Sequence, residues 1–259
     1  MAGHSHWARI KRKKGVTDAR RGRLWSKLAR AVIVAAKAGG PDPDANLSLR
    51  YAIDAAKAAN MPKDTIENAI KKGAGGGEGE NYETVYYEGY GAGGVALLIH
   101  ALTNNRNRTA PEVKKNFERA GGSMGASGCV KWMFAPKGIV TVPQSAADED
   151  RIAEIALDAG AEDYQLQTDV WEITTSAEAY EPLRQALAKA GLEPQSSELS
   201  MVPSSRVTVD AEQGAKVLRL IEALEDQDDV QNVYANYDIP EEVMAAMGRR
   251  GTPANNSCL

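Results

Sequence analysis

Residues 138–200 read GIVTVPQSAADEDRIAEIALDAGAEDYQLQTDVWEITTSAEAYEPLRQALAKAGLEPQSSELS. Short runs rich in β-branched and aromatic residues alternate here with longer segments of helical period. Strands are predicted at 138–142, 164–168, 170–175 and 195–200, and helices at 147–159 and 178–190. The order βαββαβ is that of the ferredoxin-like fold. The sequence therefore predicts such a domain over residues 136–203.

The segments on either side of this domain have a related make-up. Predicted strands and helices of the flanks are strands 82–88, 95–103, 130–134, 206–210 and 230–237 and helices 110–120 and 212–224. We expect them to form a second α/β domain from residues 79–135 and 204–240, with the first domain inserted into it. The tail, 241–259, has no diagnostic pattern.

The N-terminal part is predicted to be helical. One helical pattern covers 18–38 and ends at the breaker GGPDP, and a second covers 46–59. Pro62 suits the first turn of a third helix, where its missing N–H costs nothing, and this helix ends at Gly73. The run GAGGGEGE that follows is typical of a linker. Residues 1–78 are thus a basic arm and a helical domain. The predicted fold class is α+β, with this helical domain followed by two ferredoxin-like α/β domains.

The net charge of −4 conceals a strong asymmetry. Residues 1–37 carry eleven Lys and Arg and one acid, Asp18, for a local charge of +10, so the remainder carries −14. An acidic body with a basic arm is typical of a protein that binds a polyanion through one defined region. The alternative, a solvated basic tail, fits this density of cations less well.

Cysteine usage and hydropathy limit the class of protein. Cys129 and Cys258 are the only cysteines and lie far apart, so the sequence predicts neither a disulfide framework nor a cysteine-based zinc site. The basic N-terminus has no apolar core of a secretory signal, and no apolar run approaches the roughly 20 residues that span a bilayer. We expect a cytoplasmic protein with no membrane partner.

Two enzyme motifs match in their letters only. Residues 89–94 fit G-x-G-x-x-G, but the dinucleotide motif needs a helix next, and residues 95–99 (VALLI) favour a strand. Residues 121–125 fit G-x-S-x-G, which requires a histidine downstream of the serine. The three histidines, His4, His6 and His100, all lie upstream. With no P-loop motif either, we predict no catalytic residue, no cofactor and no small-molecule substrate; an enzyme is the least favoured class.

The opening MAGHSHWARIKRKKGVTDARRGRLWSKLARAV is the candidate nucleic-acid contact. Lys and Arg that neutralise phosphates release condensed counterions, and Arg adds bidentate hydrogen bonds. Trp7 is expected to stack on a base and Trp25 to pack against the helices. His4 and His6 could also hold a metal weakly, but a phosphate or base contact is favoured and no metal site is predicted. The predicted contacts are His4, His6, Trp7, Arg9, Lys11, Arg12, Lys13, Lys14, Arg20, Arg21, Arg23, Lys27 and Arg30.

A second basic patch, NNRNRT at 104–109, lies between a predicted strand and a predicted helix. Thr109 could cap that helix and leave N–H groups for an anion. Arg106, Arg108, Lys114 and Lys115 are its predicted contacts. A purely structural loop is an equal alternative.

Several uncommon strings give the chain a family resemblance. They are MAGHSHWARIKRKKGVTDARRG at the start, AKAANMPKDTIENAIKKG (56–73), YEGYGAGGVALLIHALTNNRNRT (87–109) and GGSMGASGCVKWMF (121–134). In this order they resemble the YebC/PmpR family, which includes mitochondrial translational activators of cytochrome oxidase synthesis. The resemblance implies three domains and a cytosolic regulator of gene expression, with the basic opening and the loop 105–109 matching basic segments of the family.

Two functions remain open. The first is a DNA-binding transcriptional regulator, although the sequence shows no clear helix-turn-helix with a polar recognition face. The second is a ribosome- or rRNA-associated translation factor that relieves stalling at proline-rich stretches, which an unstructured basic arm suits. In both cases the acidic α/β domains are expected to orient or contact a protein partner.

Overall fold

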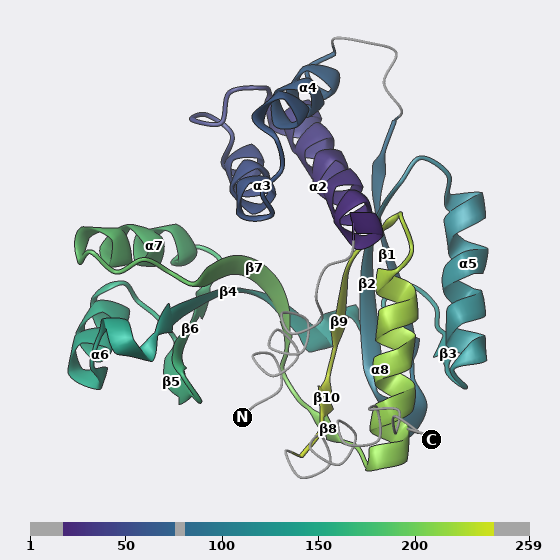
Figure 1. Ribbon diagram of the computed structural model, residues 1–259. Coiled ribbons are helices and arrows are strands. Elements are labelled where there is room, and N and C mark those ends of the chain that lie inside the picture. The colour runs from purple at the N-terminus through teal and green to yellow at the C-terminus, as the bar shows by residue number, and fades with distance from the viewer. Residues whose placement is uncertain (1–17, 76–80, 241–259) are drawn as a thin grey trace, which may run out of the picture. The chain divides into compact units, whose positions relative to one another are not determined.

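The computed structural model describes residues 18–75 and 81–240 (Figure 1). These residues form two compact units. The βαββαβ unit comprises 131–208 and 236–239, and the larger unit comprises 18–75, 81–130 and 209–235 with Pro240. Helices come first and α/β elements follow, which confirms the predicted α+β class. Within the two described stretches, no helix combines the length and apolar character that a membrane span requires.

The βαββαβ unit has the predicted ferredoxin-like order. Its elements are β4 (Phe134–Pro143), α6 (Glu149–Asp158), β5 (Asp163–Gln167), β6 (Val170–Ser176), α7 (Tyr180–Lys189) and β7 (Ser196–Pro203). The four strands pair antiparallel in the order β5-β6-β4-β7, and α6 and α7 cover one face (Figure 1). Gly138 faces α7, since a Cβ there would lie 2.5 Å from Cδ2 of Tyr180. Val140, two residues on, therefore shares that face and is fully buried opposite Ile173.

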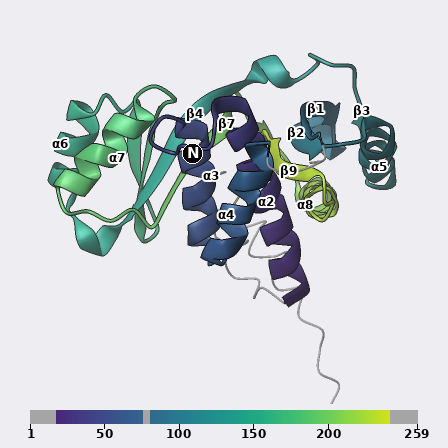
Figure 2. The same ribbon diagram turned by 90° about the horizontal axis from the view of Figure 1, so that it is seen from above.

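The larger unit contains a second antiparallel sheet. Its elements are β1 (Glu83–Tyr90), β2 (Ala96–Thr103), α5 (Arg106–Arg119), β3 (Ser123–Met124), α8 (Ala211–Glu225) and β9 (Val230–Ala235). The strand order is β3-β1-β2-β9, and α5 and α8 lie next to each other on one face (Figures 1 and 2). Gly89 lets the sheet approach α5 closely, because a Cβ there would lie 2.8 Å from the Phe117 ring. The make-up resembles that of the first sheet, but its chain order, ββαβ…αβ, differs.

Several element predictions need correction. Residues 131–133 form a 3-10 turn and the strand begins at Phe134, so the strand predicted at 130–134 was wrong. The strand predicted at 206–210 shrinks to β8 (Val207–Thr208), which pairs with β10 (Tyr237–Asp238). Helix α5 begins at Arg106, one turn before the predicted start at 110. The strand predicted at 95–103 is confirmed as β2, which follows the turn at 91–95.

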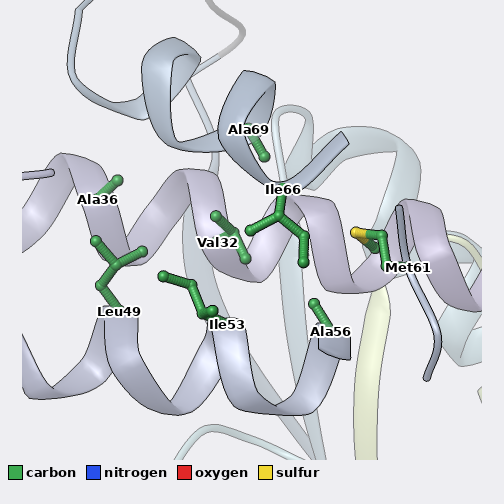
Figure 3. Packing of buried hydrophobic residues seen from close by; sticks show 8 residues of the cluster. All are labelled: Val32, Ala36, Leu49, Ile53, Ala56, Met61, Ile66 and Ala69. Carbon is green, nitrogen blue, oxygen red and sulfur yellow. The ribbon is translucent and has the colours of Figure 1, made fainter. Parts of the chain in front are cut away.

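The N-terminal helices form a bundle (Figure 2). They are α2 (Asp18–Gly39), α3 (Leu47–Ala58) and α4 (Lys63–Gly73), each within one residue of its predicted bounds. Pro62 is the N-cap of α4 and not its first helical residue. The core between the helices consists of Val32, Ala36, Leu49, Ile53, Ala56, Met61, Ile66 and Ala69 (Figure 3). Trp25 packs against it and donates Nε1–H to the Ala59 carbonyl over 3.0 Å, as the packing alternative for Trp25 predicted.

Two glycines of the bundle give a matched test of this packing. A Cβ at Gly73 would lie 2.4 Å from the Ile33 carbonyl oxygen and 2.7 Å from Cβ of Ala36, where α4 meets α2. Gly73→Ala should therefore lower the free energy of unfolding by about 1–3 kcal/mol. At Gly22, inside α2, the new Cβ meets no atom within 4 Å. Gly22→Ala should raise the free energy by about 0.5–1 kcal/mol. Urea denaturation checks both, and shifts of the same sign would contradict the packing.

Candidate nucleic-acid interface

The described structure covers only part of the predicted contact surface. Outside it lie His4, His6, Trp7, Arg9, Lys11, Arg12, Lys13 and Lys14, together with the side chain of Arg20. Helix α2 continues directly from this arm and presents Arg21 and Arg23 as exposed residues in its first two turns. The remaining predicted cations of α2, Lys27 and Arg30, are half-buried.

The cations of α2 meet a run of acids at the end of α8. We call Glu225–Asp229, which joins α8 to β9, the acidic turn. Nη1 of Arg23 lies 3.5 Å from Oδ1 of Asp226, and Lys27 donates Nζ–H to the Glu225 carbonyl over 2.5 Å. Arg23, Lys27 and Arg30 share one helix face, because they are four and three residues apart. This face of α2 therefore pairs with a carboxylate and donates to a backbone carbonyl of the acidic turn.

Arg30 extends the contact to the inner end of the turn. It donates to the Asp228 carbonyl and, over 3.2 Å, to Oδ1 of Asp229. Its guanidinium carbon also lies 5.6 Å from the centre of the Tyr82 ring, a cation–π geometry. Only 18% of the Arg30 side chain is exposed, against 43% for Arg23. The contact is thus exposed at its Arg23 end and nearly closed to water at its Arg30 end.

Asp229 joins α2 to the loop between β2 and α5. Its side chain is 7% exposed, and Oδ2 accepts hydrogen bonds from Arg108 at 2.6 Å, Thr109 at 2.7 Å and Thr103 at 3.1 Å. Burial would raise the pKa of this carboxyl, but the bonds from Arg108, Thr109 and Thr103 outweigh it and hold the pKa below its ordinary value. Asp229 is therefore an ionised carboxylate at neutral pH.

The second basic patch forms the N-terminus of α5. Asn105 is its N-cap and accepts the Arg108 N–H over 3.2 Å, so the expectation that Thr109 caps this helix was wrong. The helix predicted at 110–120 was placed one turn too late, and Pro111 lies inside the helix, in its second turn. Thr109 is instead buried, donates its hydroxyl proton to Asp229, and lies with Oγ1 2.8 Å from Oγ1 of Thr103. Arg106 pairs with Glu83 at 2.6 Å.

The last two predicted cations lie further along α5. Lys114 and Lys115 are both exposed, and Lys114 lies 3.8 Å from Glu118 on the same helix. Such an exposed ion pair contributes little to stability, and Lys114 can readily exchange Glu118 for another anion. These lysines can therefore meet a phosphate without breaking the packing of α5.

Arg30 and Arg108, from patches that the sequence separates widely, meet on opposite oxygens of Asp229. Sequence reasoning missed Asp229 and the acidic turn. The string EDQDD at 225–229 was visible, but nothing local indicates that α2 is its partner. The structure thus shows Arg23, Lys27, Arg30, Arg106 and Arg108 with intramolecular partners.

Glu88 and Cys129 are side chains that could suggest enzyme chemistry, but their contacts are those of residues that hold the fold. Glu88 is buried and accepts the N–H groups of Gly128 and Val130, both over 2.7 Å, which fixes the loop after β3. Burial, and then the charge of Glu88, raise the pKa of the Cys129 thiol and disfavour its reactive thiolate. Among residues 18–75 and 81–240, no cluster of His, Cys, Asp and Glu is arranged to hold a metal ion.

Comparison with known proteins covers nearly the whole chain. Residues 5–76 match the family model "TACO1/YebC protein N-terminal domain", and residues 82–237 match "TACO1/YebC second and third domain". A protein of Rubrobacter xylanophilus is 51% identical over 246 residues, which are 95% of this chain and 98% of the relative. One of Geotalea uraniireducens is 49% identical over 247 residues, which are 95% of this chain and all of the relative. Both bear the name "Probable transcriptional regulatory protein".

A solved structure agrees with this assignment. The crystal structure of a conserved hypothetical protein from Aquifex aeolicus is 48% identical in sequence and superposes with a TM-score of 0.83. The match covers 92% of this chain and 99% of the other. The expected resemblance is thereby confirmed, and the chain belongs to the TACO1/YebC family.

Proposed function

We propose that this protein is a cytoplasmic, non-enzymatic regulator of gene expression that binds nucleic acid through its basic arm and the start of α2. The observation that carries the proposal is the charge of +10 within residues 1–37 of a chain whose total is −4. Most of these cations precede or begin α2, so a phosphate chain can follow them continuously. Affinity of this kind needs no reading of base sequence.

The position of the arginines on α2 supports an anionic ligand. The N-terminus of a helix carries a partial positive charge, which favours anions and disfavours cations. Arg21 and Arg23 nevertheless lie in the first two turns of α2. Arg21, in the first turn, therefore opposes the helix dipole, and the effect on Arg23 is smaller because it falls off beyond that turn. A bound phosphate would turn this cost into a gain, because the helix end and the arginines would attract it together.

DNA is the target that the relatives' name favours, and rRNA or the ribosome is the alternative. One observation supports the alternative: α4 follows α3 after a short turn, as a recognition helix would, but carries Asp64 and Glu67 near its N-terminal end. The N-terminal residues of a recognition helix enter the major groove between two phosphate strands, so the duplex would repel carboxylates at that position. Crosslinking in cells followed by sequencing of the bound nucleic acid separates the targets. Promoter DNA would support transcription, whereas rRNA would support translation and overturn the DNA assignment.

The acidic βαββαβ unit is suited to a protein partner. Residues 131–208 contain six Lys and Arg against thirteen Asp and Glu. Such a surface repels nucleic acid and attracts basic proteins. The domain division 1–78, 79–135 with 204–240, and 136–203 is part of this proposal, and limited proteolysis tests it. Cleavage within 136–203 before cleavage near its ends would contradict these boundaries.

A further inference from the structure

We propose that bound nucleic acid extends from the arm along α2 by displacing the acidic turn from Arg23 and Lys27, while Arg30 stays on Asp229. This inference rests on the proposed function and identifies a second phosphate-binding surface, one that the protein's own carboxylate and carbonyl groups occupy in its absence. Phosphate oxygens and the groups of the turn are chemically alike for this purpose, because both accept charge-assisted hydrogen bonds from Arg and Lys.

The outer contacts have the character of exchangeable pairs. Arg23 and Asp226 lie 3.5 Å apart with side chains 43% and 53% exposed. Exposed pairs of this length contribute little, are screened by salt, and compete poorly with a polyanion. Lys27 is held by the Glu225 carbonyl at the C-terminal end of α8, an attraction between a cation and a helix dipole. Its long side chain can turn to a phosphate without a shift of the backbone.

The contact between Arg30 and Asp229 stays in place. Arg30 and Asp229 have side chains 18% and 7% exposed, and Thr103, Thr109 and Arg108 hold Asp229 in addition. Separating this pair would leave a buried charge without its partner, which is strongly unfavourable. Displacement therefore stops between Lys27 and Arg30. The bundle remains attached to the α/β elements while its outer cations change partners.

The direction of displacement follows from the chain order. Arg23 is the outer cation nearest to the arm, and Lys27 follows about 6 Å further along the helix axis. A strand that is already held by the arm meets Asp226 first. Its high local concentration then favours exchange at Arg23 and next at Lys27.

The test compares Asp226→Asn with Glu193→Gln in the full chain. Each variant removes one negative charge; Glu193 is an exposed loop residue of the βαββαβ unit and serves as the control. The probes are a 20-base-pair DNA duplex and a single-stranded RNA of 20 nucleotides. Asp226→Asn should bind whichever probe the unaltered protein binds, and roughly two- to fivefold more tightly than Glu193→Gln does. This factor corresponds to the free energy of an exposed ion pair. A freed Arg23 predicts that this gain in affinity is largest at low salt and shrinks as salt screens the charges, whereas a gain that does not change with salt would contradict the exchange.

A double-mutant cycle separates displacement from a general charge effect. In the Arg23→Gln background, Asp226→Asn should no longer raise affinity beyond the Glu193→Gln level, because the cation that Asp226 occupies is gone. Equal behaviour of Asp226→Asn and Glu193→Gln in a protein that binds the probe would overturn this inference and leave the proposed function standing. Failure of the unaltered protein to bind either probe would instead overturn the proposed function, and this inference with it.

Discussion

Replacing Arg9, Lys11, Arg12, Lys13 and Lys14 with glutamate is expected to abolish binding to nucleic acid. If the arm neutralises about five phosphates, the logarithm of the affinity of the unaltered protein should fall with the logarithm of salt at a slope of roughly −4 to −5 on duplex DNA. The variant loses these contacts and adds repulsion, so its affinity should drop on the order of a thousandfold or more at low salt. Fluorescence anisotropy over a salt series measures both quantities.

A matched variant distinguishes the loss of contacts made by the arm from the effect of a change in net charge. Lys57, Lys63, Lys71 and Lys72 are exposed on α3 and α4, and their replacement with glutamate changes the charge of the chain by nearly as much. We expect this variant to keep the salt slope. Its affinity should fall only slightly, because salt screens charges that lie outside the contact. Unchanged binding by the arm variant, or an equal loss in both variants, would show that the arm is not the contact.

Replacing Asp229 with alanine is expected to cause the largest loss of stability. The substitution leaves the half-buried Arg30 and the buried Thr103 and Thr109 without their shared acceptor. Removal of one partner from a buried ion pair costs about 3–5 kcal/mol of unfolding free energy. Asp226→Asn, at an exposed position of the same turn, should cost less than about 0.5 kcal/mol. Urea denaturation at pH 7 compares the two, and a small effect for Asp229→Ala would contradict the role assigned to the carboxylate.

The pH dependence gives an independent check on Asp229. Its pKa in the folded chain is lowered, so its contribution to stability is complete above the ordinary carboxyl pKa and is lost as the pH falls through the lower folded value. The unaltered protein should therefore lose more unfolding free energy between neutral and acid pH than the Asp229→Ala variant. Parallel curves for the two proteins would show that the carboxyl is not held in its ionised form.

The sequence was sufficient for elements whose period is long and regular. The apolar spacing of Leu28, Val32 and Ala35 indicated α2, and the β-branched runs around Val140 and Ile173 indicated two strands of the βαββαβ unit. Shorter elements were missed: β3 has two residues, Ser123 and Met124, too few to show a period of two. The start of α5 was placed one turn late, because its first four residues, RNRT, are polar and show no helical period of apolar residues.

The charge of the arm, and with it the candidate function, was also a property of the sequence alone, since a count of cations requires no coordinates. What only the tertiary structure decided is which of those cations already have partners. Arg30 and Asp229 are 199 positions apart in the chain. Their contact arises where α2 meets the acidic turn, and a period of two or 3.6 residues describes only neighbours along the chain. The folded chain therefore brings together charges that local patterns can identify but cannot pair.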